Sequence, residues 1–157
     1  YITNRYKRYI YPAIITYYRE FEKNEKIIWG LTADKWAFAY DDKQHYLPSN
    51  GYILTSDNIP VKYILGWINS RLMKYYFGHI GVMTAGGAYT LKAATISSLP
   101  FKIPQDTGIV ETLVDKILMK KNADVNSDVS TEESLIDEEI YRLYNLDAPD
   151  IRIVEGE

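Results

Sequence analysis

Cysteine is absent from the 157-residue sequence. The chain therefore has no disulfide, no zinc site with thiolate ligands, no cysteine-ligated iron–sulfur cluster and no cysteine nucleophile. Long apolar runs are also missing, since none approaches the roughly 18 residues that a bilayer span requires, and the N-terminus lacks the anatomy of a signal peptide. We expect a cytoplasmic protein with no membrane contact. Because the sequence begins at Tyr1 rather than Met, we also expect a fragment of a longer chain.

Catalytic motifs are scarce as well. The two histidines, His45 and His79, form no His-x-x-x-His or His-x-His pair, which are spacings typical of metal sites. The strand-end cofactor loop and the Asn/Asp-Pro-Pro-aromatic motif of adenine methyltransferases are both missing, and Gly86-Gly87 lacks the GxG pattern of a dinucleotide loop. Ser97-Ser98 lacks the context of a nucleophile elbow. We therefore predict no catalytic residue, no metal ligand and no cofactor site in this chain.

One acidic group keeps an enzyme as the third alternative. A metal-dependent nuclease needs spaced carboxylates and usually a lysine around a divalent ion, and Asp34 with Asp41-Asp42-Lys43 offers those residue types. Adjacent acids on a predicted turn point in different directions, so a surface turn is the better interpretation. A titratable cluster in a cleft that includes Asp41 or His79 would favour an enzyme.

The charge is unevenly distributed, although its net value is only −3. Residues 1–104 contain 13 Lys and Arg against 7 Asp and Glu, a net +6, whereas residues 105–157 contain 5 against 14, a net −9. The aromatic residues divide at the same place, because 20 of the 22 Trp, Phe and Tyr lie before residue 105. Such asymmetry indicates a nucleic-acid or membrane contact on the basic side. A Tyr-rich core with a solvated acidic tail is the alternative interpretation.

The apolar pattern predicts helices and short strands in the first two thirds of the chain. A helix is expected over about Pro12–Glu22, followed by strands at residues 27–29, 36–40 and 52–55 in an antiparallel meander. A longer amphipathic helix follows, and one face of it carries Val61, Ile64, Leu65, Ile68, Leu72, Tyr75 and Tyr76. This apolar face indicates a helix that packs on the sheet.

The acidic part predicts two further helices. One has apolar residues at helical spacing over 110–118, and the other begins at a capping box formed by Ser130 and Glu133 and stops at Asn145. The expected fold class is α+β, with a small antiparallel or mixed sheet supported by an amphipathic helix and followed by two C-terminal helices. The chain is divided into a helical lead-in at 1–25, an α+β core at 26–104 and an acidic helical segment of the same domain at 105–157.

Basic and aromatic residues are combined in segments typical of a nucleic-acid interface. Lys and Arg contact phosphates, whereas planar and amide side chains read base edges. Such groups occur in the segment Arg5–Tyr11, at Lys35-Trp36, in the turn after residue 42 and in a glycine-rich loop, where four glycines lie between residues 78 and 87. The predicted DNA-binding residues are Lys35, Trp36, Lys43, His45, Thr84, Gly86, Gly87, Tyr89, Thr90 and Lys92. Core packing is an equal alternative for Trp36 and Tyr89.

Three segments then match a known pattern. They are YILGWINSRLMKYYF at 63–77, GGAYTL at 86–91 leading to ISSLP at 96–100, and IDEEIYRLYNL at 136–146. In this order they resemble the Asn-Ser helix, the Leu-Pro-Ile ending and the closing helix of the TaqI-like C-terminal specificity domain of adenine-N6 DNA methyltransferases and fused type II restriction-modification enzymes. Asn145 stands where that family usually has Gly, and Lys92 is the nearest basic residue where relatives often carry Arg. The resemblance covers roughly residues 26–150.

The resemblance implies a target recognition domain, an α+β unit that clamps double-stranded DNA against a separate catalytic domain and reads a short sequence without catalysing a reaction itself. The implied parent is a DNA methyltransferase or a fused type II restriction enzyme, with its catalytic domain upstream and S-adenosylmethionine as the cofactor of that domain. Type I specificity subunits share a related domain, so the class of the parent stays open. The alternative function is a protein-interaction module that docks on a partner subunit through its acidic helices.

Overall fold

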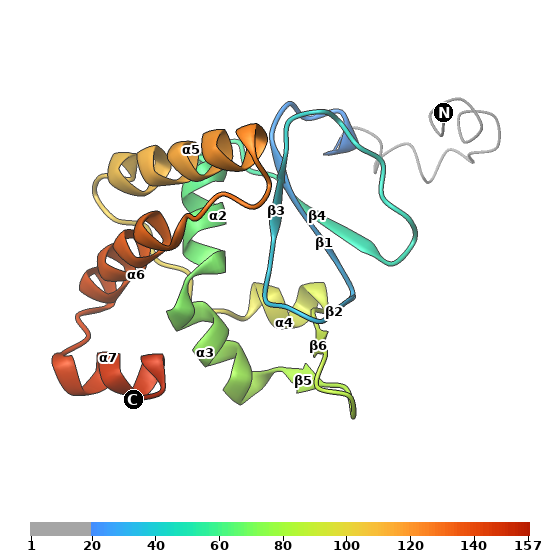
Figure 1. The fold of residues 1–157 in the computed structure, drawn as a ribbon. Helices are drawn as coiled ribbons and strands as arrows, with labels where there is room; N and C mark the ends of the chain where they lie inside the picture. Colours follow the sequence, from blue (N-terminus) through green and yellow to red (C-terminus); the bar gives the residue numbers. More distant parts are fainter. Residues whose placement is uncertain (1–19) are drawn as a thin grey trace, which may run out of the picture.

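The computed structural model describes residues 20–157. The basic and aromatic segment Arg5–Tyr11 lies outside this range, and so does nearly all of the helix expected over Pro12–Glu22. The described residues form three layers (Figure 1), in which α2 (Val61–Asn69) and α3 (Arg71–Ile80) run through the middle. The strands lie on one side of these helices, and three C-terminal helices lie on the other. The predicted α+β class is confirmed.

The larger sheet has the strand order β3-β1-β4, with β1 (Lys26–Gly30) between β3 (Ala39–Asp41) and β4 (Gly51–Leu54). Both pairings are antiparallel. The predicted meander is wrong, because it would place β3 in the centre. β1 takes that place since its consecutive residues Lys26 and Ile27 are both fully buried, and adjacent strand residues point to opposite faces of a sheet. A strand buried on both faces belongs in the middle.

A second sheet of three very short strands was not predicted. Its order is β2-β6-β5, formed by β2 (Thr32–Ala33), β6 (Tyr89–Thr90) and β5 (Val82–Met83). β5 and β6 make a hairpin out of the segment expected to be an irregular glycine-rich loop. After β6 the short helix α4 (Ala93–Ser97) follows. The hairpin projects from the lower end of the molecule in Figure 1.

The long amphipathic helix was predicted as one element, but it is interrupted at Ser70. Ser70 has an extended backbone, with φ −61° and ψ 154°. Its hydroxyl donates to the carbonyl oxygen of Trp67 at 2.7 Å and accepts from the amide of Met73 at 3.4 Å. A serine side chain that caps the next helix stabilises the break. α3 then continues through Gly78 to Ile80, beyond the predicted end.

Three C-terminal helices are present rather than the two predicted: α5 (Gly108–Ala123), α6 (Ser130–Tyr144) and α7 (Ala148–Glu155). The left-handed stop at Asn145 is confirmed, with φ 56° and ψ 40°. The capping box at the start of α6 is wrong, since Val129 is the N-cap and the Ser130 amide donates to the Asp128 carboxylate. A capping box does occur at the start of α7.

One hydrophobic core joins the middle helices to the acidic segment. A side chain at Gly66 of α2 would place its Cβ 2.6 Å from a methyl carbon of Val110 on α5, so the two helices cross at the close distance that only glycine permits. Val110, Leu113, Ile136 and Ile140 are buried in the same cluster as Trp67 and Ile68 of α2. Within residues 20–157, no helix combines the length and apolar character needed to cross a bilayer.

Candidate nucleic-acid interface

The structure divides the ten predicted DNA-binding residues into two groups. Eight lie in or beside the second sheet: Lys35, Trp36, Thr84, Gly86, Gly87, Tyr89, Thr90 and Lys92. The other two, Lys43 and His45, follow β3, whose last residue Asp41 pairs with Lys26 at the start of β1. β2 follows the far end of β1, so the groups are separated by the length of that strand, about 13 Å at 3.3 Å per residue.

The hairpin of the first group has a tight turn at its tip. The amide of Gly87 donates to the carbonyl oxygen of Thr84 at 2.9 Å, and the amide of Ala88 donates to the Thr84 hydroxyl at 3.0 Å. Gly87 has φ +82°, a conformation that favours glycine and is typical of a hairpin turn of this length. Gly86 is exposed, and a Cβ at this position would come no closer than 4.0 Å to Thr84 Oγ1. The tip therefore presents backbone with little side-chain cover.

Trp36 and Tyr89 support this sheet from its inner face. The Trp36 indole nitrogen donates to the carbonyl oxygen of Ile68 at 2.8 Å, and its ring lies 5.0 Å from that of Phe77. The Tyr89 ring lies 5.8 Å from Trp36 and 6.0 Å from Phe77. Both side chains are half-buried and pack against the core. Their contacts fix the small sheet to α3. Each side chain therefore has a structural role, with or without a contact to a nucleic acid.

The lysines of the first group are exposed. Within residues 20–157, neither Lys35 nor Lys92 has a side-chain hydrogen bond or an ion pair, and the same holds for Lys43 and Lys74. Ion pairs are formed instead by Lys23, Lys26, Lys62, Arg71, Lys120 and Arg142. A cation without an internal partner can neutralise an external anion without first breaking an ion pair. The predicted lysines are thus available for phosphate contacts.

A sequence signal for this surface was overlooked. The stretch from residue 58 to residue 105 contains five Lys and Arg and no Asp or Glu. It supplies α3, both strands of the hairpin and α4. The net charge of residues 1–104 does not reveal this acid-free stretch, because that sum also includes the earlier acids Asp34, Asp41 and Asp42. The positive potential is therefore concentrated more narrowly than the net +6 of residues 1–104 suggests.

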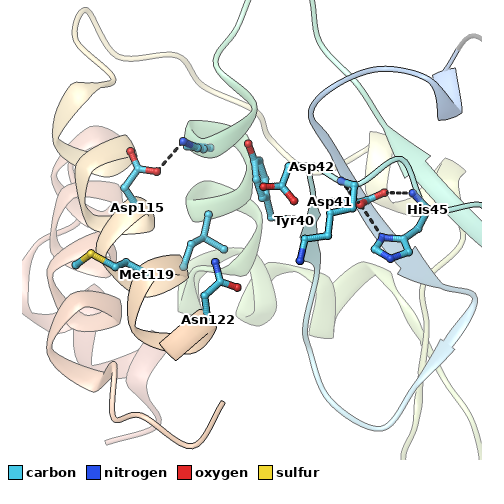
Figure 2. A pocket seen from close by; sticks show the side chains of 10 residues that line it. Tyr40, Asp41, Asp42, His45, Asp115, Met119 and Asn122 are labelled. Atoms are coloured by element: carbon cyan, nitrogen blue, oxygen red, sulfur yellow. Dashed lines mark hydrogen bonds and ion pairs between the residues drawn. The ribbon is translucent and has the colours of Figure 1, made fainter. Parts of the chain in front are cut away.

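The second group borders a pocket of about 510 Å³ between the turn after β3 and α5. Figure 2 shows Tyr40, Asp42 and His45 on one side and Asp115 and Asn122 on the other. Lys62 of α2 also lines the pocket and forms an ion pair with Asp115, with 2.6 Å between Nζ and Oδ1. Because the lining carries both signs of charge, the pocket does not form a uniform basic surface around Lys43.

Asp41 is the structural centre of that turn. It is buried and accepts from Lys26 Nζ at 2.9 Å, from the amides of Lys43 and His45 at 2.9 Å each, and from the His45 ring at 2.8 Å. Burial alone would raise the pKa of Asp41, but these donors outweigh it and lower the pKa to about 2. His45 is therefore held by Asp41, with its ring largely exposed at the rim.

The acids considered for nuclease chemistry are not brought together. Asp34 follows β2 and Asp41 ends β3, at opposite ends of β1. Both oxygens of Asp41 are occupied by hydrogen-bond donors, which is not the arrangement of an open metal ligand. In the described part of the chain, no three His, Asp or Glu side chains gather in a way that could hold a metal ion.

Comparison with known proteins adds one match. A family model described as the TaqI-like C-terminal specificity domain matches residues 2–101. No curated protein matches the chain. The matched range includes both sheets and helices α2, α3 and α4, and it ends before α5. The segment 136–146, which also carries the resemblance, lies beyond the match.

Proposed function

The chain belongs to the TaqI-like C-terminal specificity domain family, and on this basis we propose that it is a sequence-specific recognition domain for double-stranded DNA that catalyses no reaction itself. Family membership supports a DNA-recognition domain of restriction-modification enzymes. The sequence specificity, the duplex form of the DNA and the absence of catalysis are the proposal.

The observation that carries the proposal is a pair of exposed lysines beside the projecting hairpin, neither of which has an ion pair within residues 20–157. Lys92 comes two residues after β6, and Lys35 comes two residues after β2. Both strands belong to the same small sheet. Phosphate contacts from lysines position a protein on a duplex. The exposed glycine tip of the hairpin adds a place where backbone can approach DNA closely.

Electrostatics orients the domain. The segment that forms α5, α6 and α7 has a net charge of −9, and these helices lie across α2 and α3 from the strands (Figure 1). Negative charge is repelled by the phosphate backbone. We therefore propose that DNA binds against the small sheet, with the net-negative helices α6 and α7 turned away and α2 supporting the sheets from behind.

The parent enzyme is also a proposal. The domain serves an adenine-specific DNA methyltransferase or a fused type II restriction enzyme, in the cytoplasm, and a catalytic domain upstream in the same chain binds S-adenosylmethionine. This division of labour is supported by the lack of methyltransferase motifs within these 157 residues. The recognition domain would hold the duplex while the other domain carries out the reaction.

One observation favours the second candidate, a protein-interaction module. Ile109 of α5 and Leu135 of α6 are 53% and 41% exposed and line a shallow pocket of about 480 Å³. An apolar patch on a charged surface is typical of a protein interface. The acidic helices could therefore dock on a partner while the opposite side of the domain contacts DNA.

A selection experiment tests the proposed function. The 157-residue chain is incubated with a pool of randomised duplexes, the bound fraction is amplified over several rounds, and the enriched duplex is compared with a scrambled duplex of equal composition. We expect the enriched duplex to bind at least about tenfold more tightly, since specific affinity commonly exceeds non-specific affinity by larger factors. Equal affinity for the two duplexes, or no binding to either, would contradict the proposal.

A further inference from the structure

The register of the second sheet places three residues in one row. Thr90 in the central strand β6 lies opposite Thr32 of β2 on one side and opposite Val82 of β5 on the other. Directly paired residues of antiparallel strands point to the same face of a sheet. The neighbouring row is Ala33, Tyr89 and Met83. These two rows must therefore face in opposite directions.

The row that contains Thr90 is on the outer face. Tyr89 and Ala33 of the other row pack against the core, so that row faces inward. Thr32 is exposed, Thr90 is half-buried between its neighbours, and Val82 is 59% exposed. Within residues 20–157, the hydroxyls of Thr32 and Thr90 have no hydrogen-bond partner. The outer face thus carries two free hydroxyls and an uncovered isopropyl group.

An exposed cation follows this row in the chain. Leu91 is fully buried and Lys92 is exposed, and the chain turns at the end of β6, where the Lys92 amide donates to the Thr90 carbonyl oxygen at 3.1 Å. Lys92 is therefore held next to Thr90. No Asp or Glu occurs between residues 58 and 105, the stretch that supplies β5 and β6. A surface with this charge is complementary to DNA, because no acid from its two hairpin strands would repel the phosphates.

The chemistry of the row fits base edges in the major groove. Threonine hydroxyls can donate to or accept from any base, and an apolar side chain contacts the 5-methyl group of thymine. The major groove admits a two-stranded β-ribbon, and the hairpin of β5 and β6, which carries Val82 and Thr90, is such a ribbon. Phosphate contacts from Lys92 would set the depth at which the row meets the bases.

We propose that Thr32, Thr90 and Val82 form a specificity-determining row that reads base edges in the major groove, with Val82 against a thymine methyl group. This inference rests on the proposed function and deepens it. Thr90 was already a predicted contact. Thr32 and Val82 were not, because two-residue strands leave no periodic pattern in a sequence.

The test removes the two partners of the methyl contact separately. In the enriched duplex each thymine is replaced in turn by deoxyuridine, which lacks only the 5-methyl group. We expect one such replacement to weaken wild-type binding about fourfold, the ratio expected for one buried methyl group. In Val82→Ala the same replacement should have no effect, because the contacting methyl groups are gone.

Two further variants complete the design. Val82→Thr keeps the branched shape of the side chain and replaces one methyl by a hydroxyl, so it separates an altered preference from a folding defect. Val125→Ala is the matched control, because Val125 is 73% exposed and lies in the turn between α5 and α6. We expect this control to show the same fourfold response to deoxyuridine as the wild type.

The outcomes separate the inference from the proposed function. If Val82→Ala and wild type respond alike to every deoxyuridine, the row does not read thymine and the inference is overturned while DNA recognition stands. If Val82→Ala weakens binding to the enriched and scrambled duplexes equally, the contact is not with bases, and the inference is again overturned. If the wild-type chain binds no duplex at all, the proposed function itself fails.

Discussion

Asn69 and Phe38 are joined by two hydrogen bonds that run in opposite directions. The Phe38 amide donates to Asn69 Oδ1 at 2.9 Å, and Asn69 Nδ2 donates to the Phe38 carbonyl oxygen at 3.0 Å. The last residue of α2 thereby fixes the backbone that leads into β3. Trp36, two residues earlier, is fixed to the same turn of α2 through Ile68. The Asn-Ser pair of the family-like helix thus attaches the helix to the sheet and then caps α3.

Removal of the Asn69 amide should destabilise the fold. In Asn69→Ala, both backbone groups of Phe38 lose their partner in a half-buried place, which costs about 2 kcal/mol in the free energy of unfolding. Urea denaturation measures this loss. Asn58→Ala is the control, since Asn58 is exposed and has no side-chain bond among the described residues. Equal stability of the two variants would show that the Asn69–Phe38 bonds contribute nothing.

Because of Asp137, the free energy of unfolding should decrease as the pH rises from about 4 to about 6. Burial raises its pKa to about 6, because desolvation outweighs the donors from Arg71, which is itself half exposed. Between pH 4 and pH 6 the folded carboxyl keeps a proton that the unfolded chain has lost. A rise in pH across this window therefore lowers the free energy of unfolding, by up to about 3 kcal/mol.

The substitution Asp137→Asn isolates this effect from that of Asp41, whose lowered pKa acts in the opposite direction at lower pH. We expect the stability of Asp137→Asn relative to wild type to increase from pH 4 to about pH 6 and then to level off. A constant difference for Asp137→Asn would mean that its carboxyl titrates alike in the folded and unfolded chain.

Three glycines should respond differently to alanine. Gly87→Ala should lower stability by about 1 kcal/mol, because φ is +82° there. Gly86→Ala should leave stability unchanged, since its Cβ meets only Thr84 Oγ1 at 4.0 Å, but should weaken binding to the enriched duplex if DNA approaches the tip. Gly78→Ala, in α3 with free space around it, should gain roughly 0.5–1 kcal/mol.

Thermal unfolding and duplex affinity are measured on all three variants. Gly78→Ala is the control for affinity, because it changes an exposed glycine on the helix rather than at the hairpin tip. If Gly86→Ala binds the enriched duplex as tightly as the wild type, the hairpin tip does not contact DNA. Full stability in Gly87→Ala would contradict the left-handed turn.

Long periodic elements could be predicted from the sequence, and short ones could not. The apolar spacing of α5 and α6 and the αL stop at Asn145 are strong local signals, and the structure confirms them. The break at Ser70 leaves the apolar spacing nearly unchanged, so periodicity cannot show it. The strand order β3-β1-β4 is decided by burial on both faces of β1, which depends on the helices that cover it.

The sequence shows the residue types of the candidate site but not their arrangement. The glycines and lysines of the hairpin region are visible as residue types, and the structure places eight of the ten residues around one small sheet. Lys43 and His45 were grouped with them because charge and aromatic content are similar in both turns. Only the pairing of Asp41 with Lys26 reveals that their turn lies at the other end of β1.

The salt dependence of duplex binding tests DNA recognition by this surface most directly. Affinity for the enriched duplex is measured between about 50 and 200 mM salt, for wild type, for Lys35→Ala with Lys92→Ala, and for Lys116→Ala. Lys116 is exposed and without an ion pair among the described residues, but it lies on α5, across α2 and α3 from the strands. We expect a negative log–log slope that becomes shallower by about two in the double variant and is unchanged in Lys116→Ala. A slope near zero for wild type, or the same slope for the double variant, would contradict phosphate binding by Lys35 and Lys92.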